Sequence, residues 1–231
     1  MASDSLEHLT TALRHALSPA RLGSIADSKH LPHAYQHATP FPHAVIDGLF
    51  PSSLLAALSR EIPDQAAANA GESAGGACKG AGGGTYANAR TLGNSSADQW
   101  ARRVRCWDGV DKNGAGATIR KQSVEDESNM GPATLLTFSQ LRGSSFAEFL
   151  SRISGIPGLV ADPEYFGSGI HVTTRGGLLK VHADFNYHPK MRMRRRVNVF
   201  LFINEDWPTD YGGDLELWDR SMTRCACCVA P

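Results

Sequence analysis

The first sixty residues carry apolar side chains mainly at helical spacing. From Ser5 to Leu17, leucines recur every three or four positions, which predicts an amphipathic helix that Ser18-Pro19 ends. The segment from Phe41 to Phe50 (FPHAVIDGLF) is typical of a short strand that runs into a turn. A further helix is expected after Pro51, through Arg60, with its leucines on one apolar side.

Helical periodicity returns in the middle of the chain. Gly131-Pro132 is expected to start a helix, because proline is tolerated in the first turn. Ser144-Ser145 is expected to cap another helix, which turns Phe146 and Phe149 inward and stops at Gly155. We expect these two helices to form a compact pair.

From about Gly167 the period changes from helical to strand-like, with short apolar runs between glycine, proline and charged turns. Helices followed by a run of strands predict helices packed outside a β-barrel or sandwich. The expected strands are Gly169–Thr174, Leu178–Val181, Val197–Ile203 and Leu215–Trp218.

A glycine-rich stretch, residues 65–94, interrupts these elements. No lysine-serine or lysine-threonine pair follows its glycines, so it is not a phosphate loop. Its low complexity predicts a mobile insertion that has no core of its own.

The charge and composition of the chain exclude several classes of function. The 231 residues include 23 basic and 23 acidic side chains, so no net charge draws the chain to nucleic acid or to an anionic membrane. No apolar run reaches the ~18–20 residues of a membrane span, and the first ten residues lack the apolar core of a secretory signal. Five cysteines, three of them between Cys225 and Cys228, make no disulfide framework. We therefore predict a cytoplasmic protein, with organellar targeting left open.

The most informative residues are His182 and Asp184, at the end of an apolar strand in GGLLKVHADFN. Side chains two positions apart on a strand share a face, so an imidazole and a carboxylate converge on one point. That pair is two-thirds of the 2-His-1-carboxylate triad that holds Fe(II) in non-haem oxygenases. The alternative interpretation is a strand-end salt bridge or a turn cap.

The surrounding sequence resembles the iron- and 2-oxoglutarate-dependent oxygenases, in particular their prolyl-4-hydroxylase-like branch. The resemblance covers DPEYFGSGIHVTTRGGLLKVHADFNYHP and RRRVNVFLFINEDWPTDYGGDLELWD, between residues 162 and 219. A glycine turn leads a strand into His182-Ala183-Asp184, a basic stretch leads a long apolar strand, and Gly212-Gly213 turns into Leu215-Glu216-Leu217. The earlier FPHAVIDGLFP also looks like the entry strand of this branch.

The resemblance implies an α+β protein with a mainly β core, a double-stranded β-helix (jelly roll) with flanking N-terminal helices. It implies Fe(II) held by His182 and Asp184, 2-oxoglutarate and O₂ as co-substrates, and L-ascorbate to keep the iron reduced. The implied reaction hydroxylates a C–H bond, commonly of a prolyl residue, while 2-oxoglutarate is decarboxylated to succinate. The substrate is expected to be a protein or a small molecule, with no nucleic acid and no membrane involved. We accordingly place an N-terminal helix and linker at residues 1–40 and an oxygenase domain at 41–231, with the insertion at 65–94.

Alternation along Val197–Ile203 leaves the orientation of that strand open. Asn198 and Phe200, together with Phe202, would line the cofactor cavity if their face is inward. The alternative puts the aliphatic face inward and leaves Asn198 in solvent.

The chain departs from the family pattern after its last histidine, His188. The family needs a second histidine well beyond the first, and then a basic residue for the distal carboxylate of 2-oxoglutarate; the sequence has neither. We expect His188 to be a solvated loop residue. His171 lies upstream on the neighbouring strand and could face the cavity, but the motif does not place a ligand there. We expect a truncated product that lacks the last barrel strands, leaves Leu215–Trp218 with unpaired edges, and is weakly active or inactive.

Two other functions stay open: a non-catalytic jelly-roll binding module derived from such an enzyme, and a cupin-like isomerase or sugar-modifying protein.

Zinc binding by the cysteines of Cys225–Cys228 is disfavoured, because the two-residue spacer of zinc sites is missing. The basic run from Lys190 to Arg196 is better explained as a solvated strand entry than as a phosphate site. His30, His33 and His37 are expected to be surface or loop histidines.

Overall fold

The computed structural model describes residues 2–28, 30–62, 85–86, 104–110 and 117–231. The chain divides into two compact units. Unit 1 comprises residues 1–59, 132–164 and 185–231, and unit 2 comprises residues 60–131 and 165–184. The two units are described separately below.

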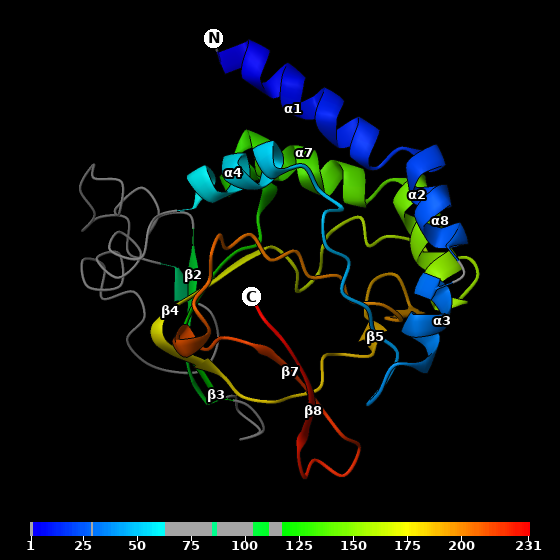
Figure 1. Cartoon of the computed structure of the whole chain (residues 1–231). Coiled ribbons are helices and arrows are strands. Elements are labelled where there is room, and N and C mark those ends of the chain that lie inside the picture. Colours follow the sequence, from blue (N-terminus) through cyan, green and yellow to red (C-terminus); the bar gives the residue numbers. More distant parts are fainter. Residues whose placement is uncertain (1, 29, 63–84, 87–103, 111–116) are drawn as a thin grey trace, which may run out of the picture. The chain divides into compact units, whose positions relative to one another are not determined.

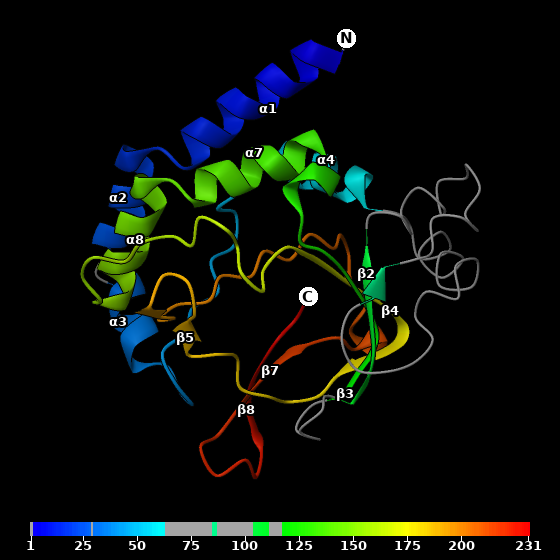
Figure 2. The same cartoon turned by 180° about the vertical axis from the view of Figure 1, so that it is seen from behind.

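Unit 1 is built on six helices (Figure 1). In both views of the ribbon, α1 lies along α7, while α2 and α3 lie along α8 (Figures 1 and 2). The helices are α1 (Ala2–Ala16), α2 (Pro19–Asp27), α3 (His30–His37), α4 (Ser52–Glu61, whose last two residues belong to unit 2), α7 (Pro132–Leu141) and α8 (Ser144–Ser154).

Local signals explain where these helices begin and end. The Ser18 hydroxyl accepts a hydrogen bond from the Arg21 backbone N–H at 3.4 Å, so the residue that ends α1 also caps α2. Gly155 has φ +72° and ends α8 in the left-handed conformation, as expected. The cap at the start of α8 was predicted wrongly: the capping residue is Gly143, and no side chain caps this end. His30–His37 forms a helix, in which the rings of His33 and His37 stack.

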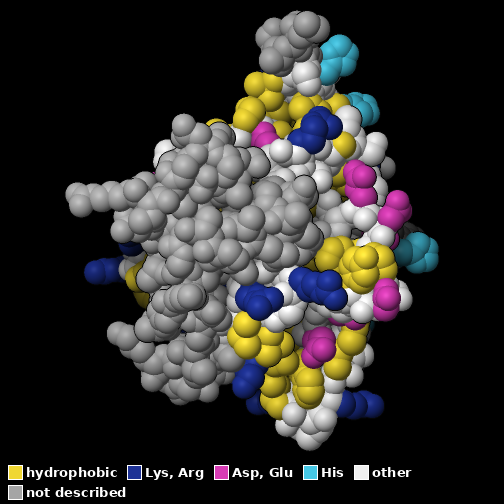
Figure 3. All heavy atoms as spheres, turned by 90° about the vertical axis from the view of Figure 1, so that its left-hand side faces the viewer, with side chains coloured by type: hydrophobic (Ala, Val, Ile, Leu, Met, Phe, Trp, Pro, Cys, Tyr) yellow, Lys and Arg dark blue, Asp and Glu magenta, His cyan; other side chains and the backbone are white. Residues whose placement is uncertain are grey.

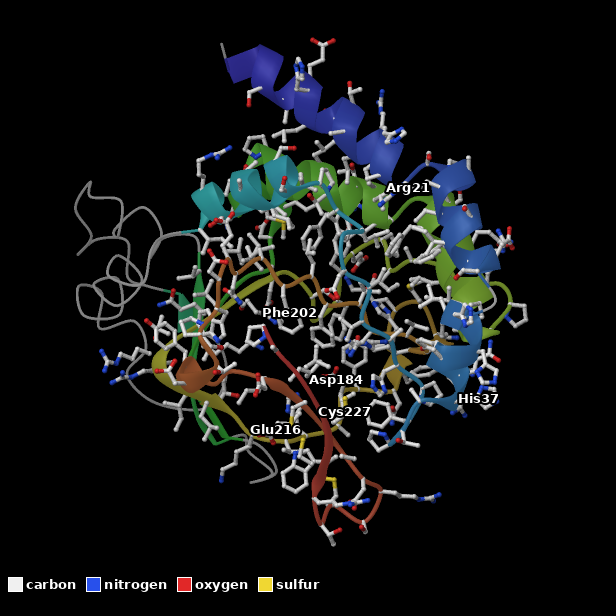
Figure 4. The ribbon with its side chains drawn as sticks, viewed as in Figure 1. Arg21, His37, Asp184, Phe202, Glu216 and Cys227 are labelled. Carbon is white, nitrogen blue, oxygen red and sulfur yellow. The ribbon has the colours of Figure 1, made fainter. Side chains whose placement is uncertain are left out.

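The buried hydrophobic cluster of unit 1 is helical. A mainly β core was expected, but the fully buried Leu13, Leu54 and Phe149 come from α1, α4 and α8. Arg21 ties this cluster to the following chain, because its guanidinium donates to the carbonyls of Ala16, Leu49 and Gly48 (Figure 4). The buried members are Leu9, Leu13, Leu17, Leu22, Ala26, Leu49, Leu54, Ala57, Leu58, Ala133, Phe146, Phe149 and Ile153.

Two expected strands of unit 1 do not form. Residues 41–50 and 197–203 are both without strand pairing. The second segment nevertheless shows the alternation of its sequence, since Leu201 and Ile203 pack against the helical cluster while Phe200 stays 55% exposed. The aliphatic face is therefore buried only in part, since Val199 is 46% exposed, and helices rather than neighbouring strands bury it.

Short hairpins supply the strands of unit 1. β5 (Tyr187–His188) pairs antiparallel with β6 (Met193–Arg194). The expected strand Leu215–Trp218 forms as β7, and its partner is β8 (Cys225–Val229). The expectation of unpaired edges at Leu215–Trp218 is therefore wrong for the edge that β8 covers. The Gly212-Gly213 turn before β7 has φ +66° and +87°, values that favour glycine, and a short helix η3 (Thr209–Tyr211) precedes it.

Unit 2 contains a four-stranded antiparallel sheet, with η2 (Glu127–Asn129) after its third strand. The strands are β1 (Thr85–Tyr86), β2 (Arg105–Val110), β3 (Ala117–Val124) and β4 (Ile170–Leu179), paired in that order. The predicted insertion at 65–94 lies outside the described residues, except for Thr85–Tyr86, which pair with β2.

Strand β4 replaces two separate expected strands, and it ends at Leu179 rather than Val181. Its register against β3 shifts between Thr173, opposite Lys121, and Leu178, opposite Ile119. Within this bulge Gly176 has φ +76°, and Arg120 donates to the Arg175 carbonyl at 2.7 Å. The glycine turn that the sequence indicated is therefore a bulge inside one strand.

The described residues thus form helices and three small antiparallel sheets, without a closed barrel. Within the same residues, no helix has both the length and the apolar character needed to cross a bilayer. On the face shown in Figure 3, basic and acidic side chains both occur around the grey residues, in keeping with the zero net charge of the sequence.

Candidate metal centre

His182 and Asp184 lie in unit 2, in the segment that follows β4. This segment is without strand pairing, so the two side chains are placed by the chain beyond the strand and not by strand geometry. Their side chains are 39% and 41% exposed, which leaves both open to solvent and solutes (Figure 4 labels Asp184).

A backbone carbonyl sets the tautomer of His182. Its Nδ1 lies 2.7 Å from the Lys180 carbonyl oxygen, which only accepts hydrogen bonds, so Nδ1 carries the hydrogen. In the neutral ring, Nε2 then has the lone pair. That Nε2 lies 3.5 Å from Asp184 Oδ1, so the ring presents an acceptor to a second acceptor.

Two facing acceptors are complementary to a cation. Metal bonds to imidazole nitrogen and to carboxylate oxygen are about 2.1 Å long, so two atoms 3.5 Å apart can bind one ion together. Ligating histidines are commonly held through their other ring nitrogen by a carbonyl, which is the contact between His182 and Lys180. The donor set of one nitrogen and one oxygen suits Fe(II).

Strand β3 adds charge around this pair. Lys121, Glu125 and Asp184 each interact electrostatically with His171. Lys121 also interacts with Asp184. Burial lowers the pKa of Lys121, against the opposing carboxylates of Glu125 and Asp184. Sequence spacing gave no indication of Lys121 or Glu125, since pairing between β3 and β4 brings them near.

His171 lies on β4 opposite Ser123 of β3. Part of its side chain is accessible to solvent, yet desolvation by its packed neighbours, together with the Lys121 cation, lowers its pKa to about 4. His171 is therefore neutral near pH 7. The sequence left open that His171 faces the cavity and assigned it no ligand role, and the structure puts it in the electrostatic surroundings of Asp184.

A third protein ligand does not join the pair in the part of the chain that the structure describes. Across those residues, no group of three or more His, Cys, Asp and Glu side chains is arranged to hold a metal ion. His182 and Asp184 thus provide two donors.

His188 differs from expectation. It was predicted to be a solvated loop residue, but it lies in β5 of unit 1 and is only 6% exposed. Its Nδ1 accepts a hydrogen bond from the Met191 N–H at 3.0 Å, and its Nε2 lies 3.3 Å from Asp162 Oδ2. The ring is thus buried with a backbone hydrogen bond at Nδ1 and with a carboxylate, distant in sequence, at ion-pair distance from Nε2.

Asn198 and Phe200 are exposed in unit 1, and the Arg195 guanidinium donates to the Asn198 carbonyl oxygen. Phe202, labelled in Figure 4, is 36% exposed. A role for Asn198 and Phe200 in holding a co-substrate stays a prediction.

Comparison with known proteins bears on the same part of the chain. Residues 168–231, a little more than a quarter of the chain, match the model of the 2OG-Fe(II) oxygenase superfamily. No curated protein and no solved structure matches the chain. The matched segment begins just before β4 and includes both His182 and Asp184. This match supports placing the chain in the 2OG-Fe(II) oxygenase superfamily.

Proposed function

We propose that the protein is an Fe(II)- and 2-oxoglutarate-dependent dioxygenase in which His182 and Asp184 are metal ligands. One observation carries the proposal: within the segment that matches the superfamily, the lone pair of His182 Nε2 faces a carboxylate oxygen at 3.5 Å. A neutral imidazole and a carboxylate in this arrangement are complementary to a metal ion bound between them.

The donor atoms fit such a metal ion, so their roles follow from the contacts. The Lys180 carbonyl fixes the His182 ring and, in the neutral ring, leaves the lone pair on Nε2, and Asp184 supplies the negative charge. When bound, Fe(II) supplies the oxidative chemistry that decarboxylates 2-oxoglutarate to succinate and hydroxylates a C–H bond of the substrate with O₂.

The remaining parts of the proposal rest on the resemblance. We infer a jelly-roll fold for the domain, ascorbate as the reductant, and a prolyl residue as one candidate substrate. The neutral net charge supports a protein or small-molecule substrate over nucleic acid.

A non-catalytic binding module is the second candidate. It is supported by the ligand count, because two donors are arranged for a metal among the described residues and a third is not. Two protein ligands hold iron less tightly than three. A third interpretation is that His182 is doubly protonated and forms a salt bridge with Asp184, without any metal.

The test is an anaerobic Fe(II) titration of the full chain, followed by a succinate assay with 2-oxoglutarate and O₂. We expect saturable binding of one Fe(II), lost in the double variant H182A/D184A and kept in H30A, whose exposed histidine lies on α3. Succinate formation that the double variant lacks supports the oxygenase. Iron binding without succinate supports the binding module, and identical behaviour of all three proteins contradicts the metal site.

A further inference from the structure

Three cysteines follow one another closely on β8, the second strand of the hairpin in unit 1. The register against β7 is irregular here: Trp218 is opposite Cys225 and Leu217 is opposite Cys227, so Ala226 is an extra residue. Such a bulge breaks the alternation of side chains along a strand. Cys225 and Cys228, which regular alternation would put on opposite faces, come together.

The two sulfur atoms are in contact. Cys225 Sγ lies 2.8 Å from Cys228 Sγ, and the Cys225 thiol also lies 3.2 Å from the Cys227 carbonyl oxygen. A disulfide bond is about 2.05 Å long, so the sulfurs need to close by less than about 1 Å. Cys227 (labelled in Figure 4) contributes its carbonyl to this contact and not its sulfur.

Both thiols are reachable. All three cysteines of β8 are reduced; Cys228 is exposed and Cys225 is partly exposed. A small oxidant can therefore meet the pair without unfolding of the hairpin.

We propose that Cys225 and Cys228 form a redox-active dithiol, which a hydroperoxide converts to a disulfide within strand β8. In the first step the Cys225 thiolate attacks a peroxide oxygen and the O–O bond breaks, so that Cys225 becomes a sulfenic acid, and the hydroxide or alkoxide that leaves takes up the proton given up by the Cys225 thiol. In the second step Cys228 sulfur attacks Cys225 sulfur, the S–O bond breaks, and the hydroxide that leaves takes up the Cys228 proton as water. With hydrogen peroxide, two thiols and one peroxide give one disulfide and two waters.

The surroundings of Cys228 determine which sulfur reacts first. Its pKa is raised to about 11, chiefly by the hydrogen bond with Cys225, with desolvation and the carboxylates of Glu216 and Asp214 as further causes. Cys228 therefore keeps its proton at neutral pH and shares it with the neighbouring sulfur. We therefore assign the attack on the oxidant to the Cys225 sulfur, because the raised pKa of Cys228 keeps that neighbour protonated.

This site is independent of the proposed metal centre. A zinc site of three cysteines is not supported, since the described residues show no group of three suitable donors. The dithiol needs two sulfurs, which is the number that the bulge brings together.

The test maps the disulfide in the full chain. The reduced protein is treated with hydrogen peroxide, quenched, alkylated with iodoacetamide and digested with trypsin, which cleaves after Arg224 and releases residues 225–231. We expect this peptide to lose two hydrogen atoms and to carry a single alkyl group, on Cys227. Alkylation that persists on Cys228, a bond that includes Cys227, or a crosslink to another peptide contradicts the proposal.

Single cysteine-to-serine variants distinguish the Cys225–Cys228 pair from the neighbouring Cys227. In C228S the peptide is expected to lose the internal disulfide, and the sulfenic acid of Cys225 should become trappable with dimedone. C227S is the matched control, and it should form the disulfide as the wild type does. If a variant does not fold, the position of the disulfide in the wild-type protein is sufficient to test the proposal.

The pH profile of alkylation gives a second readout. In the reduced wild type, Cys228 should be alkylated half-maximally near pH 11. In C225S the main cause of the raised pKa is gone, so the profile of Cys228 should move toward the ordinary value of 9.0. An unchanged profile in C225S contradicts the contact between the two sulfurs.

Discussion

Two histidine–aspartate pairs in this protein use the same residue types in opposite ways. At His182 the Nδ1 donates to a carbonyl, so Nε2 presents its lone pair to Asp184. At His188 the Nδ1 accepts from a backbone N–H, so in the neutral ring Nε2 carries the hydrogen beside Asp162. Both side chains of the first pair are open to solvent, whereas in the second pair the His188 ring is buried and its Nε2 lies in ion-pair distance of a partly buried carboxylate. The partner of Nδ1 thus decides whether a histidine next to a carboxylate is available to a metal.

The largest expected effect is the loss of iron binding in H182A. We expect at least a roughly 100-fold rise in the Kd for Fe(II), because loss of a ligand exceeds the 10–100-fold cost of losing its supporting partner. The free energy of unfolding should change by less than about 0.5 kcal/mol, since this side chain is 39% exposed. Isothermal titration without oxygen measures the first quantity and urea unfolding the second. Equal iron affinity in H182A and wild type would remove His182 from the site.

The opposite pattern is expected for H188A. Removal of this buried ring leaves the Met191 N–H and the Asp162 carboxylate without their partner, which should lower the free energy of unfolding by about 2 kcal/mol. Iron affinity of the folded protein should stay within about twofold of wild type. Urea unfolding at fixed protein concentration checks the stability. A strong loss of iron affinity in folded H188A contradicts the distinction between the pairs.

The sequence predicted the helices better than the strands, because helical signals are local. The end of α1 before Ser18-Pro19 and the Gly155 stop of α8 depend on residues within a turn of them, and both were identified correctly, whereas the Ser18 cap of α2 was not predicted. Strand partners lie far away in the chain, so neither the exposure of both Val199 and Phe200 nor the pairing of β7 with β8 could be derived from spacing.

At the candidate site, too, local features could be predicted from the sequence and contacts between distant residues could not. His182 and Asp184 are two residues apart, and their convergence was expected. The tautomer of His182 depends on where the Lys180 carbonyl points, and the charge of Lys121 arrives through the pairing of β3 with β4. The burial of His188 depends on Asp162, which no local pattern connects with it.

A pair of asparagine variants compares the two carboxylates directly. D184N keeps the shape of the side chain but removes the charge, so iron binding should weaken by roughly tenfold with little change in stability. D162N should leave iron binding unchanged and lower the free energy of unfolding by about 1 kcal/mol, because it removes the carboxylate charge that lies 3.3 Å from the buried His188 Nε2. The same two assays measure both variants. Matching effects of D184N and D162N in either assay would erase the difference between the pairs.

The smallest expected effect concerns Lys121, the cation that acts on Asp184 from β3. Its positive charge opposes a second cation at the carboxylate, so K121M should bind Fe(II) a few-fold more tightly than wild type, on the order of 0.5–1 kcal/mol. K121R keeps the charge and should leave the affinity unchanged, which separates the charge from the packing of the side chain. Because the effect is electrostatic, added salt should shrink the gap between K121M and wild type. A gap that does not respond to salt, or weaker binding in K121M, would show that Lys121 supports the position of Asp184 more than it opposes the ion's charge.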